Sequence, residues 1–169
     1  MEKNIILIGM MGCGKTTVGG LLAQRLDRPL VDTDTLIEER QGRSIPDIFA
    51  REGEEYFRNL ELELCRELSG QEGLVIACGG GLPTQEEAIS ALRENGLVFW
   101  LDRDPGETYD GLDVSGRPLA QAGRDEFLRR YQNRAPVYRR WTDHAIPCGD
   151  GPRKAVDLIS TIYTEVRKL

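Results

Sequence analysis

The chain has 169 residues, 40% of them hydrophobic and 30% charged, and its net charge at pH 7 is −6. This length suits one domain with an α/β core, and the acidic balance excludes a general nucleic-acid-binding protein with a broad basic face. Nothing resembles a signal peptide and no apolar stretch approaches membrane-spanning length, so we expect a cytoplasmic protein without a membrane partner.

Strand and helix signals alternate along the chain, which predicts a parallel sheet covered by helices on both faces. We expect strands at residues 5–8, 29–31, 74–78, 97–101 and 144–147. We expect helices at 17–26, 35–41, 54–68, 86–93, 125–133 and 156–166, and a further one capped by Ser44. Residues 102–123 are rich in Gly and Asp and predict a mobile loop. With no repeat and no linker, residues 1–169 form one predicted domain.

A phosphate-binding loop is predicted at residues 9–16, Gly-Met-Met-Gly-Cys-Gly-Lys-Thr. The glycines allow backbone N–H groups to turn toward phosphate oxygens, and the following helix directs its positive end at them. Lys15 can reach the β- and γ-phosphates, and the Thr16 hydroxyl can ligate Mg²⁺. An ordinary Gly-rich turn is the alternative, but the strand before the loop and the helix after it favour nucleotide binding.

Two carboxylates follow the second predicted strand, in Asp32-Thr33-Asp34. In open α/β sheets ligands bind beyond the carboxyl ends of the strands, and residues two apart in extended chain project to the same side. Asp32 is therefore a candidate for holding Mg²⁺ through water, and Asp34 for orienting an acceptor hydroxyl and taking its proton late. The alternative is a pair of N-cap residues for the next helix.

Glycines and arginines supply the remaining candidates. Gly79-Gly80-Gly81 follows a strand and predicts a close approach to the backbone, unless it is a plain flexible turn. Arg58 lies beside Glu61 on a helix, where an ordinary solvated pair is the alternative. Arg117 lies in the glycine-rich loop and can act as an arginine finger. Arg134 lies near a predicted helix end, where it can also compensate the helix dipole.

The four cysteines are widely spaced, without metal-ligand or redox patterns: Cys13, Cys65, Cys78 and Cys148. We expect reduced thiols, as in a cytoplasmic protein. Cys13 lies in the phosphate loop, where a helix N-terminus favours the thiolate, and is the predicted reactive thiol.

The order of these segments resembles the shikimate kinase family over nearly the whole chain. The phosphate loop is followed by Val31-Asp32-Thr33-Asp34 and by a segment from Gly42-Arg43-Ser44-Ile45 to Phe57-Arg58. The family's later segments appear in the same order as Cys78-Gly79-Gly80-Gly81, Arg117-Pro118-Leu119 and Arg134-Ala135-Pro136-Val137-Tyr138.

This resemblance implies a three-layer α/β P-loop kinase fold with a five-stranded parallel sheet in the order 2-3-1-4-5. It implies a substrate-binding helical segment at about 33–61 and a lid at about 110–124 within the single domain. The implied reaction is transfer of the γ-phosphate of ATP to the 3-hydroxyl of shikimate, a step of aromatic amino-acid biosynthesis. The implied partners are ATP and shikimate, with Mg²⁺ as cofactor.

The resemblance also assigns roles residue by residue. The implied catalytic residues are Lys15, Asp34 and Arg117. Nucleotide binding is expected from Gly12, Cys13, Gly14, Lys15, Thr16, Thr17, Arg117 and Arg153. Shikimate binding is expected from Asp34, Arg58, Gly79, Gly80, Gly81 and Arg134, with Arg58 and Arg134 clamping its carboxylate. Thr16 and Asp32 would serve Mg²⁺.

One position departs from the family. Where the family commonly has an arginine that packs on adenine, this chain has Asp110. The Tyr109 ring is a candidate replacement, and Arg153 lies where the family places another adenine neighbour. His144 is expected to be structural, since the implied mechanism needs no histidine.

Two other functions are open to the sequence. A kinase for another small polyol acid, such as gluconate, would share the fold and the phosphate loop. A catalytically silent ATP-binding module is disfavoured by the intact Lys15, Thr16, Asp32 and Asp34. A GTPase is a weaker alternative still, because no Asn-Lys-x-Asp segment appears. A monomer is the expectation, because one domain can form the whole site.

Overall fold

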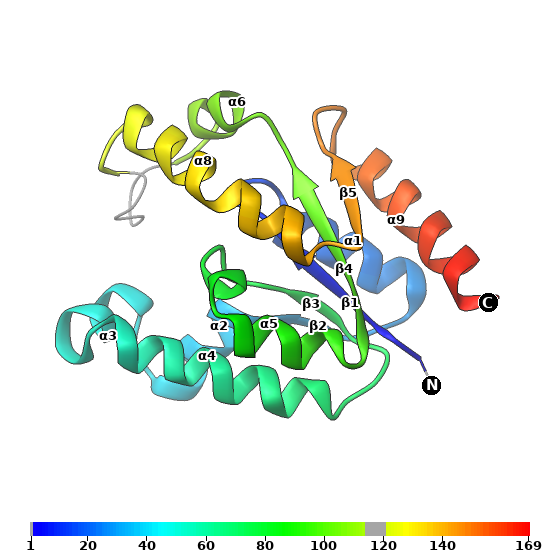
Figure 1. The fold of residues 1–169 in the computed structure, drawn as a ribbon, viewed down its shortest axis with the longest axis horizontal. Coiled ribbons are helices and arrows are strands. Elements are labelled where there is room, and N and C mark those ends of the chain that lie inside the picture. The colour runs from blue at the N-terminus through cyan, green and yellow to red at the C-terminus, as the bar shows by residue number, and fades with distance from the viewer. Residues whose placement is uncertain (1, 114–120) are drawn as a thin grey trace.

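The protein is described by a computed structural model at residues 2–113 and 121–169, drawn as a ribbon in Figure 1. Five parallel strands form one sheet in the order β2-β3-β1-β4-β5, which confirms the predicted fold class and strand order. The strands are β1 (Asn4–Ile8), β2 (Leu30–Asp32), β3 (Val75–Ala77), β4 (Gly96–Asp102) and β5 (His144–Pro147).

Helices connect successive strands and cover the sheet. They are α1 (Lys15–Leu26), α2 (Thr33–Gln41), α3 (Ile45–Glu52), α4 (Glu54–Ser69), α5 (Glu86–Arg93), α6 (Pro105–Asp110), α8 (Arg124–Trp141) and α9 (Pro152–Arg167), with a 3₁₀ turn η1 (Leu82–Thr84). Within the described ranges, no helix combines the length and the apolar character that crossing a bilayer requires.

Alternate side chains of β1, β2, β3 and β4 enter two separate apolar cores. Ile5 and Leu7 of β1 pack with α1 and α9, whereas Ile6 and Ile8 pack in the core that α4, α5 and α8 complete. Successive side chains of a strand point to opposite faces, so a strand buried on both sides needs a continuous apolar run. Figure 1 shows α1 and α9 on one side of the sheet and α4, α5 and α8 on the other.

All five strands run in the same direction, so the segments that follow them meet at one edge of the sheet. Residue pairing places the end of β2 beside the end of β3, at Asp32 and Ala77, and the end of β1 beside β4, at Ile8 and Trp100. The phosphate loop, the β2–α2 junction and the glycine triplet are therefore neighbours. In Figure 1, α8 lies above this edge, and α3 and the start of α4 lie below it.

The prediction of a loop throughout residues 102–123 is wrong at its start. Residues 105–110 form α6, whose N-cap residue Asp104 accepts a hydrogen bond of 2.9 Å from the Glu107 N–H. Pro105 occupies the first helical position, where its fixed φ suits a helix and no N–H is needed. An Asp-Pro pair is thus a start signal that the abundance of glycine in this segment concealed.

The predicted helix at 125–133 is too short. In the structure α8 continues through Pro136 to Trp141, so Arg134 lies inside a helix and not near its end. Proline removes one backbone hydrogen bond, but the buried Ala135, Tyr138 and Trp141 hold the last turns of α8 against the core. Tertiary packing here outweighs local helix propensity.

Candidate active site

The phosphate loop connects β1 to α1 through three glycines with positive φ. Gly9, Gly12 and Gly14 have φ angles of 149°, 76° and 105°, a region that residues with a Cβ atom rarely adopt. A Cβ atom on Gly9 would also lie 2.8 Å from the Cys13 Sγ atom. The loop therefore depends on glycine for both its conformation and its packing, as the sequence pattern predicted.

The Lys15 ammonium group lies against the loop that precedes it. Its Nζ atom donates hydrogen bonds to the carbonyl oxygens of Gly9, at 2.6 Å, and Met10, at 2.8 Å. The first turn of α1 thus places a positive charge and unpaired backbone N–H groups at the same point. This arrangement can hold a polyphosphate.

Thr16 and Asp32 meet, as expected for a shared metal site. The Thr16 hydroxyl donates to Asp32 Oδ2 at 2.9 Å, while Asp32 Oδ1 accepts the Thr35 N–H at 3.1 Å. Asp32 is thus the N-cap residue of α2, which confirms the alternative from the sequence, and its second oxygen contacts Thr16 of the phosphate loop. The assumption of extended chain from Asp32 to Asp34 is wrong, because α2 begins at Thr33.

Asp34 lies in the first turn of α2 and faces the interior of the site. Burial, with the nearby charge of Asp32, raises the pKa of Asp34 to about 6, although Lys15 and Arg58 oppose this shift. Its carboxylate is ionised at neutral pH but holds a proton more readily than an exposed aspartate. A perturbed carboxyl beside a phosphate loop is typical of a functional site.

Each glycine of the triplet after β3 faces one expected site residue. A Cβ atom on Gly79 would collide with the Asp34 carboxylate, and one on Gly81 would collide with the Arg58 guanidinium. On Gly80 it would lie 3.1 Å from Arg134 Nη1. None of the three glycines has a positive φ, so space and not backbone conformation demands glycine here. The predicted close approach to this backbone is made by the side chains of the site.

Arg58 is held by a buried carboxylate, which excludes the alternative of an ordinary solvated pair. Its Nη1 atom lies 2.5 Å from Glu61 Oε1, and the Glu61 side chain is 1% exposed. Gln85 donates to the same Oε1 atom at 2.9 Å. Burial raises the pKa of Glu61 to about 7, against the opposing effect of Arg58. Glu61 and Gln85 therefore orient Arg58 toward the glycine triplet.

Arg134 reaches the triplet from the opposite side, on α8. The next turn of α8 carries Tyr138, which is fully buried and donates a hydrogen bond of 2.7 Å to the Gly80 carbonyl. On the other flank the Gly79 N–H donates to the buried Thr33 hydroxyl at 2.9 Å. Sequence analysis missed Thr33, Tyr138 and Gln85 as supports of the site, since no short motif marks contacts between distant segments.

The described start of the predicted lid packs on the phosphate loop. A Cβ atom on Gly12 would collide with the Leu112 side chain, which follows α6. The predicted finger Arg117 lies outside the described residues.

Asp110, which stands where the family commonly has an arginine, pairs with a residue of the facing helix α8. Asp110 forms an ion pair of 3.1 Å with Arg124, the first residue of α8, so a guanidinium is present beside this position. The Tyr109 ring packs against Phe127, with ring centroids 5.5 Å apart, and belongs partly to the core. This packing does not favour the interpretation of Tyr109 as the ring that replaces the family's arginine.

Two further expected residues occupy less defined places. Arg153 is exposed in the first turn of α9, on the same edge of the sheet as the phosphate loop. Thr17 is exposed in the first turn of α1.

All four cysteines are buried free thiols, including Cys13, so a reagent reaches Cys13 only if the loop opens.

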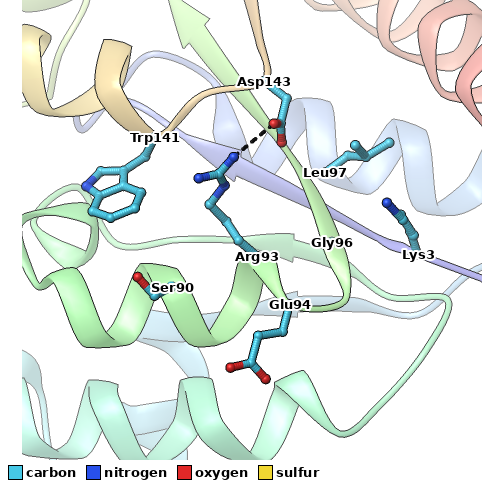
Figure 2. Close-up of a pocket in the computed structure, with 8 residues that line it drawn as sticks. All are labelled: Lys3, Ser90, Arg93, Glu94, Gly96, Leu97, Trp141 and Asp143. Carbon is cyan, nitrogen blue, oxygen red and sulfur yellow. Dashed lines mark hydrogen bonds and ion pairs between the residues drawn. The ribbon is translucent and has the colours of Figure 1, made fainter.

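A separate hollow of about 400 Å³ lies at the opposite edge of the sheet, where β4 and β5 begin (Figure 2). Two of its charged residues pair with each other, since Arg93 lies 3.1 Å from Asp143, and Asp143 also accepts the Val98 N–H. It contains none of the predicted site residues and is distant from the phosphate loop along the strands.

The sequence profile of the shikimate kinase family matches residues 11–163. The chain belongs to the shikimate kinase family. A shikimate kinase of Clostridium botulinum (strain Alaska E43 / Type E3) is 35% identical over 169 residues, which cover 100% of this chain and 98% of the relative. One from Symbiobacterium thermophilum is 50% identical over 119 residues, 69% of this chain and 68% of the relative.

Solved structures agree with this assignment. The structure of a shikimate kinase from Acinetobacter baumannii in complex with shikimate aligns with a TM-score of 0.87 at 35% identity, covering 99% of this chain and 94% of that chain. As a member of the shikimate kinase family the chain is an ATP-dependent phosphotransferase, as the sequence predicted.

The contacts of the glycine triplet predict how a substitution at Gly79 changes the kinetics of this shikimate kinase family member. Gly79→Ala places a methyl group where the Asp34 carboxylate lies, so Asp34 must move. We expect kcat/KM for shikimate to fall about 100-fold, because displacing a side chain of an active site by about an ångström can have effects of this size. Steady-state kinetics with the purified variant measures the loss.

Gly20→Ala is the matched control, because Gly20 lies inside α1 with open space where its Cβ atom would be. We expect unchanged kinetics and a free energy of unfolding higher by about 1 kcal/mol, the usual effect of replacing glycine by alanine in a helix. Equal kinetics for both variants would contradict the claim that Gly79 makes room for Asp34.

The buried carboxyl group of Glu61 makes the stability of the protein depend on pH. The folded protein binds the carboxyl proton of Glu61 more tightly than the unfolded chain does, so the free energy of unfolding falls as pH rises from 4.5 to about 7. Glu61→Gln removes this contribution, which is about 1–3 kcal/mol. Urea unfolding over this pH range should give a flatter profile for Glu61→Gln than for the parent, whereas Glu54→Gln, at an exposed partner of Arg58, should keep the parent's slope.

Proposed function

We propose that this chain transfers the γ-phosphate of ATP to the 3-hydroxyl of shikimate, giving shikimate 3-phosphate and ADP, with Asp34, Arg58 and Arg134 holding the acceptor. The observation that carries this proposal is the glycine triplet, whose backbone is approached by these three side chains directly beside the phosphate loop. A carboxylate for a hydroxyl and two guanidiniums for a carboxylate are the groups that shikimate requires.

The nucleotide binds through the phosphate loop. Backbone N–H groups from Gly12 to Thr17 and the positive end of α1 bind the phosphates, and Lys15 balances the charge on the transferred group. Because its ammonium is already held by the Gly9 and Met10 carbonyls, Lys15 needs little rearrangement to reach a phosphate.

The Thr16 hydroxyl and the Asp32 carboxylate fit Mg²⁺, which prefers oxygen ligands and usually takes only a few from protein. When bound with ATP, Mg²⁺ neutralises charge on the β- and γ-phosphates. Asp32 keeps its position through the Thr35 N–H, so one carboxylate oxygen stays directed at Thr16.

Asp34 positions the acceptor hydroxyl and accepts its proton as the new bond to phosphorus forms. A pKa of about 6 leaves it ionised at neutral pH and able to hold the proton until product release. Phosphoryl transfer depends mainly on positioning and charge stabilisation, so a stronger base is not needed.

Arg58 and Arg134 hold the acceptor's carboxylate from two sides of the triplet. A planar guanidinium can bind both carboxylate oxygens, which orients the ring as well as binding it. Glu61 balances the charge of Arg58 and fixes its direction, while Tyr138 holds the Gly80 backbone against Arg134.

The remaining elements complete the proposal. Residues 33–61 form the acceptor-binding segment and 110–124 a lid that brings Arg117 to the phosphates, within one domain that works as a monomer. Arg153 borders the adenine. Closure of the lid would exclude water, so that ATP is transferred and not hydrolysed. The four free thiols suit a cytoplasmic enzyme.

The test is an ADP-release assay with Mg-ATP and shikimate, quinate, gluconate or no acceptor. We expect turnover with shikimate and only background release with the other three. Turnover with gluconate instead would favour a kinase for another polyol acid. ATP binding without turnover on any acceptor would favour a silent nucleotide-binding module, and both results would overturn the proposal.

Asp34→Asn tests the role of the carboxylate. The amide keeps the shape but cannot accept the proton, so we expect kcat to fall about 10²–10⁴-fold while the dissociation constant of ATP stays unchanged. Asp47→Asn, at a residue of α3 whose side chain is 47% exposed and pairs with Arg51, should leave kcat at the parent's value. A kcat for Asp34→Asn within a factor of about three of the parent would remove Asp34 from the chemistry.

A further inference from the structure

The inner face of α8 carries another arginine, Arg130, to which the reaction described above gives no task. Arg130 follows Phe127 by three residues and precedes Arg134 by four, so the three side chains share one face of the helix. Phe127 and Arg134 are buried, and Arg130 is half-buried. Arg130 therefore lies one turn from the guanidinium that is expected to hold the acceptor's carboxylate.

Arg130 differs from three other arginines of α8. Arg124, Arg129 and Arg140 are exposed and pair with carboxylates, at 3.1 Å, 2.7 Å and 3.4 Å. Among the described residues Arg130 pairs with no carboxylate, and its Nε atom is buried without a hydrogen-bond partner. A buried donor without a partner is costly, so its presence calls for a ligand.

The charges around Arg134 indicate that the ligand is an anion. Burial lowers the pKa of Arg134, Tyr138 opposes this shift, and the positive charges of Arg130 and Arg58 lower the pKa further. Glu61 compensates Arg58, but in the described parts of the chain no carboxylate pairs with Arg130 or Arg134. This side of the site thus has an excess of positive charge inside an acidic protein, and an anion would relieve it.

We propose that Arg130 is a further specificity-determining residue, which binds the acceptor's carboxylate together with Arg134 and favours acidic over uncharged acceptors. This inference rests on the proposed function and deepens it. Arg134 and Arg58 approach the carboxylate across the glycine triplet, and Arg130 approaches it from the next turn of α8 toward the helix N-terminus.

The experiment compares Arg130→Leu with the parent for two ligands, shikimate and its uncharged methyl ester. We expect the dissociation constant and KM of shikimate to rise about tenfold, and the dissociation constant of the ester, measured by competition, to change by less than about twofold. The KM of ATP should stay unchanged. Arg130→Lys, which keeps the charge, should restore part of the affinity for shikimate.

Arg129→Leu is the control, because Arg129 is the adjacent residue, exposed and paired with Glu126. It should leave both dissociation constants unchanged. Thermal unfolding separates a binding role from a structural one. Removing a half-buried cation that pairs with no carboxylate in the described part of the chain should leave the Tm of Arg130→Leu at or above the parent's, whereas a structural arginine would lower it.

Three results would overturn the inference: an unchanged affinity for shikimate, an equal loss for shikimate and the ester, or a higher KM for ATP in place of the effect on shikimate. The last would place Arg130 at the phosphates. Failure of the proposed function itself is distinguishable, because the parent protein would then show no turnover with shikimate.

Discussion

Three polar side chains from three helices approach one stretch of backbone, and the site depends on this approach. Asp34 comes from α2, Arg58 from α4 and Arg134 from α8, and each occupies space that a Cβ atom on the glycine triplet would fill. The triplet is held in turn by Thr33 and Tyr138, which bond to its backbone from opposite sides. The proposed acceptor site therefore depends on the absence of side chains at the three glycines, and small displacements there should affect binding and transfer together.

Electrostatics explains why this protein can be acidic overall and still bind anions. The charge is separated locally: Lys15 is held against the phosphate loop, while Arg58 and Arg134 lie beside the triplet and Arg130 lies near Arg134. Burial makes these cations costly and the carboxylates of Asp34 and Glu61 reluctant to ionise. The folded site stores unfavourable charge interactions that bound phosphates and a bound carboxylate relieve, which links ligand binding to stability.

The phosphate loop and the β2–α2 junction show how one residue can serve structure and chemistry. Asp32 caps α2 with one oxygen and meets Thr16 with the other, so the local signal for a helix start and the functional signal coincide. Glu61 shows the opposite case: its helical spacing from Arg58 is that of a common surface pair, and only its burial makes it part of the site.

The sequence by itself determined the features that local chemistry imposes. The strands follow from apolar runs, the phosphate loop from its glycines and Lys15, and the sheet order and reaction from the ordered segments of the family. Tertiary structure alone decided that α8 continues through Pro136, that Glu61 is buried, and that Arg130, which pairs with no carboxylate among the described residues, lies near Arg134. These features depend on contacts between segments far apart in the chain, and burial, which sets the cost of each charge, is a property of the packed molecule and not of a local pattern.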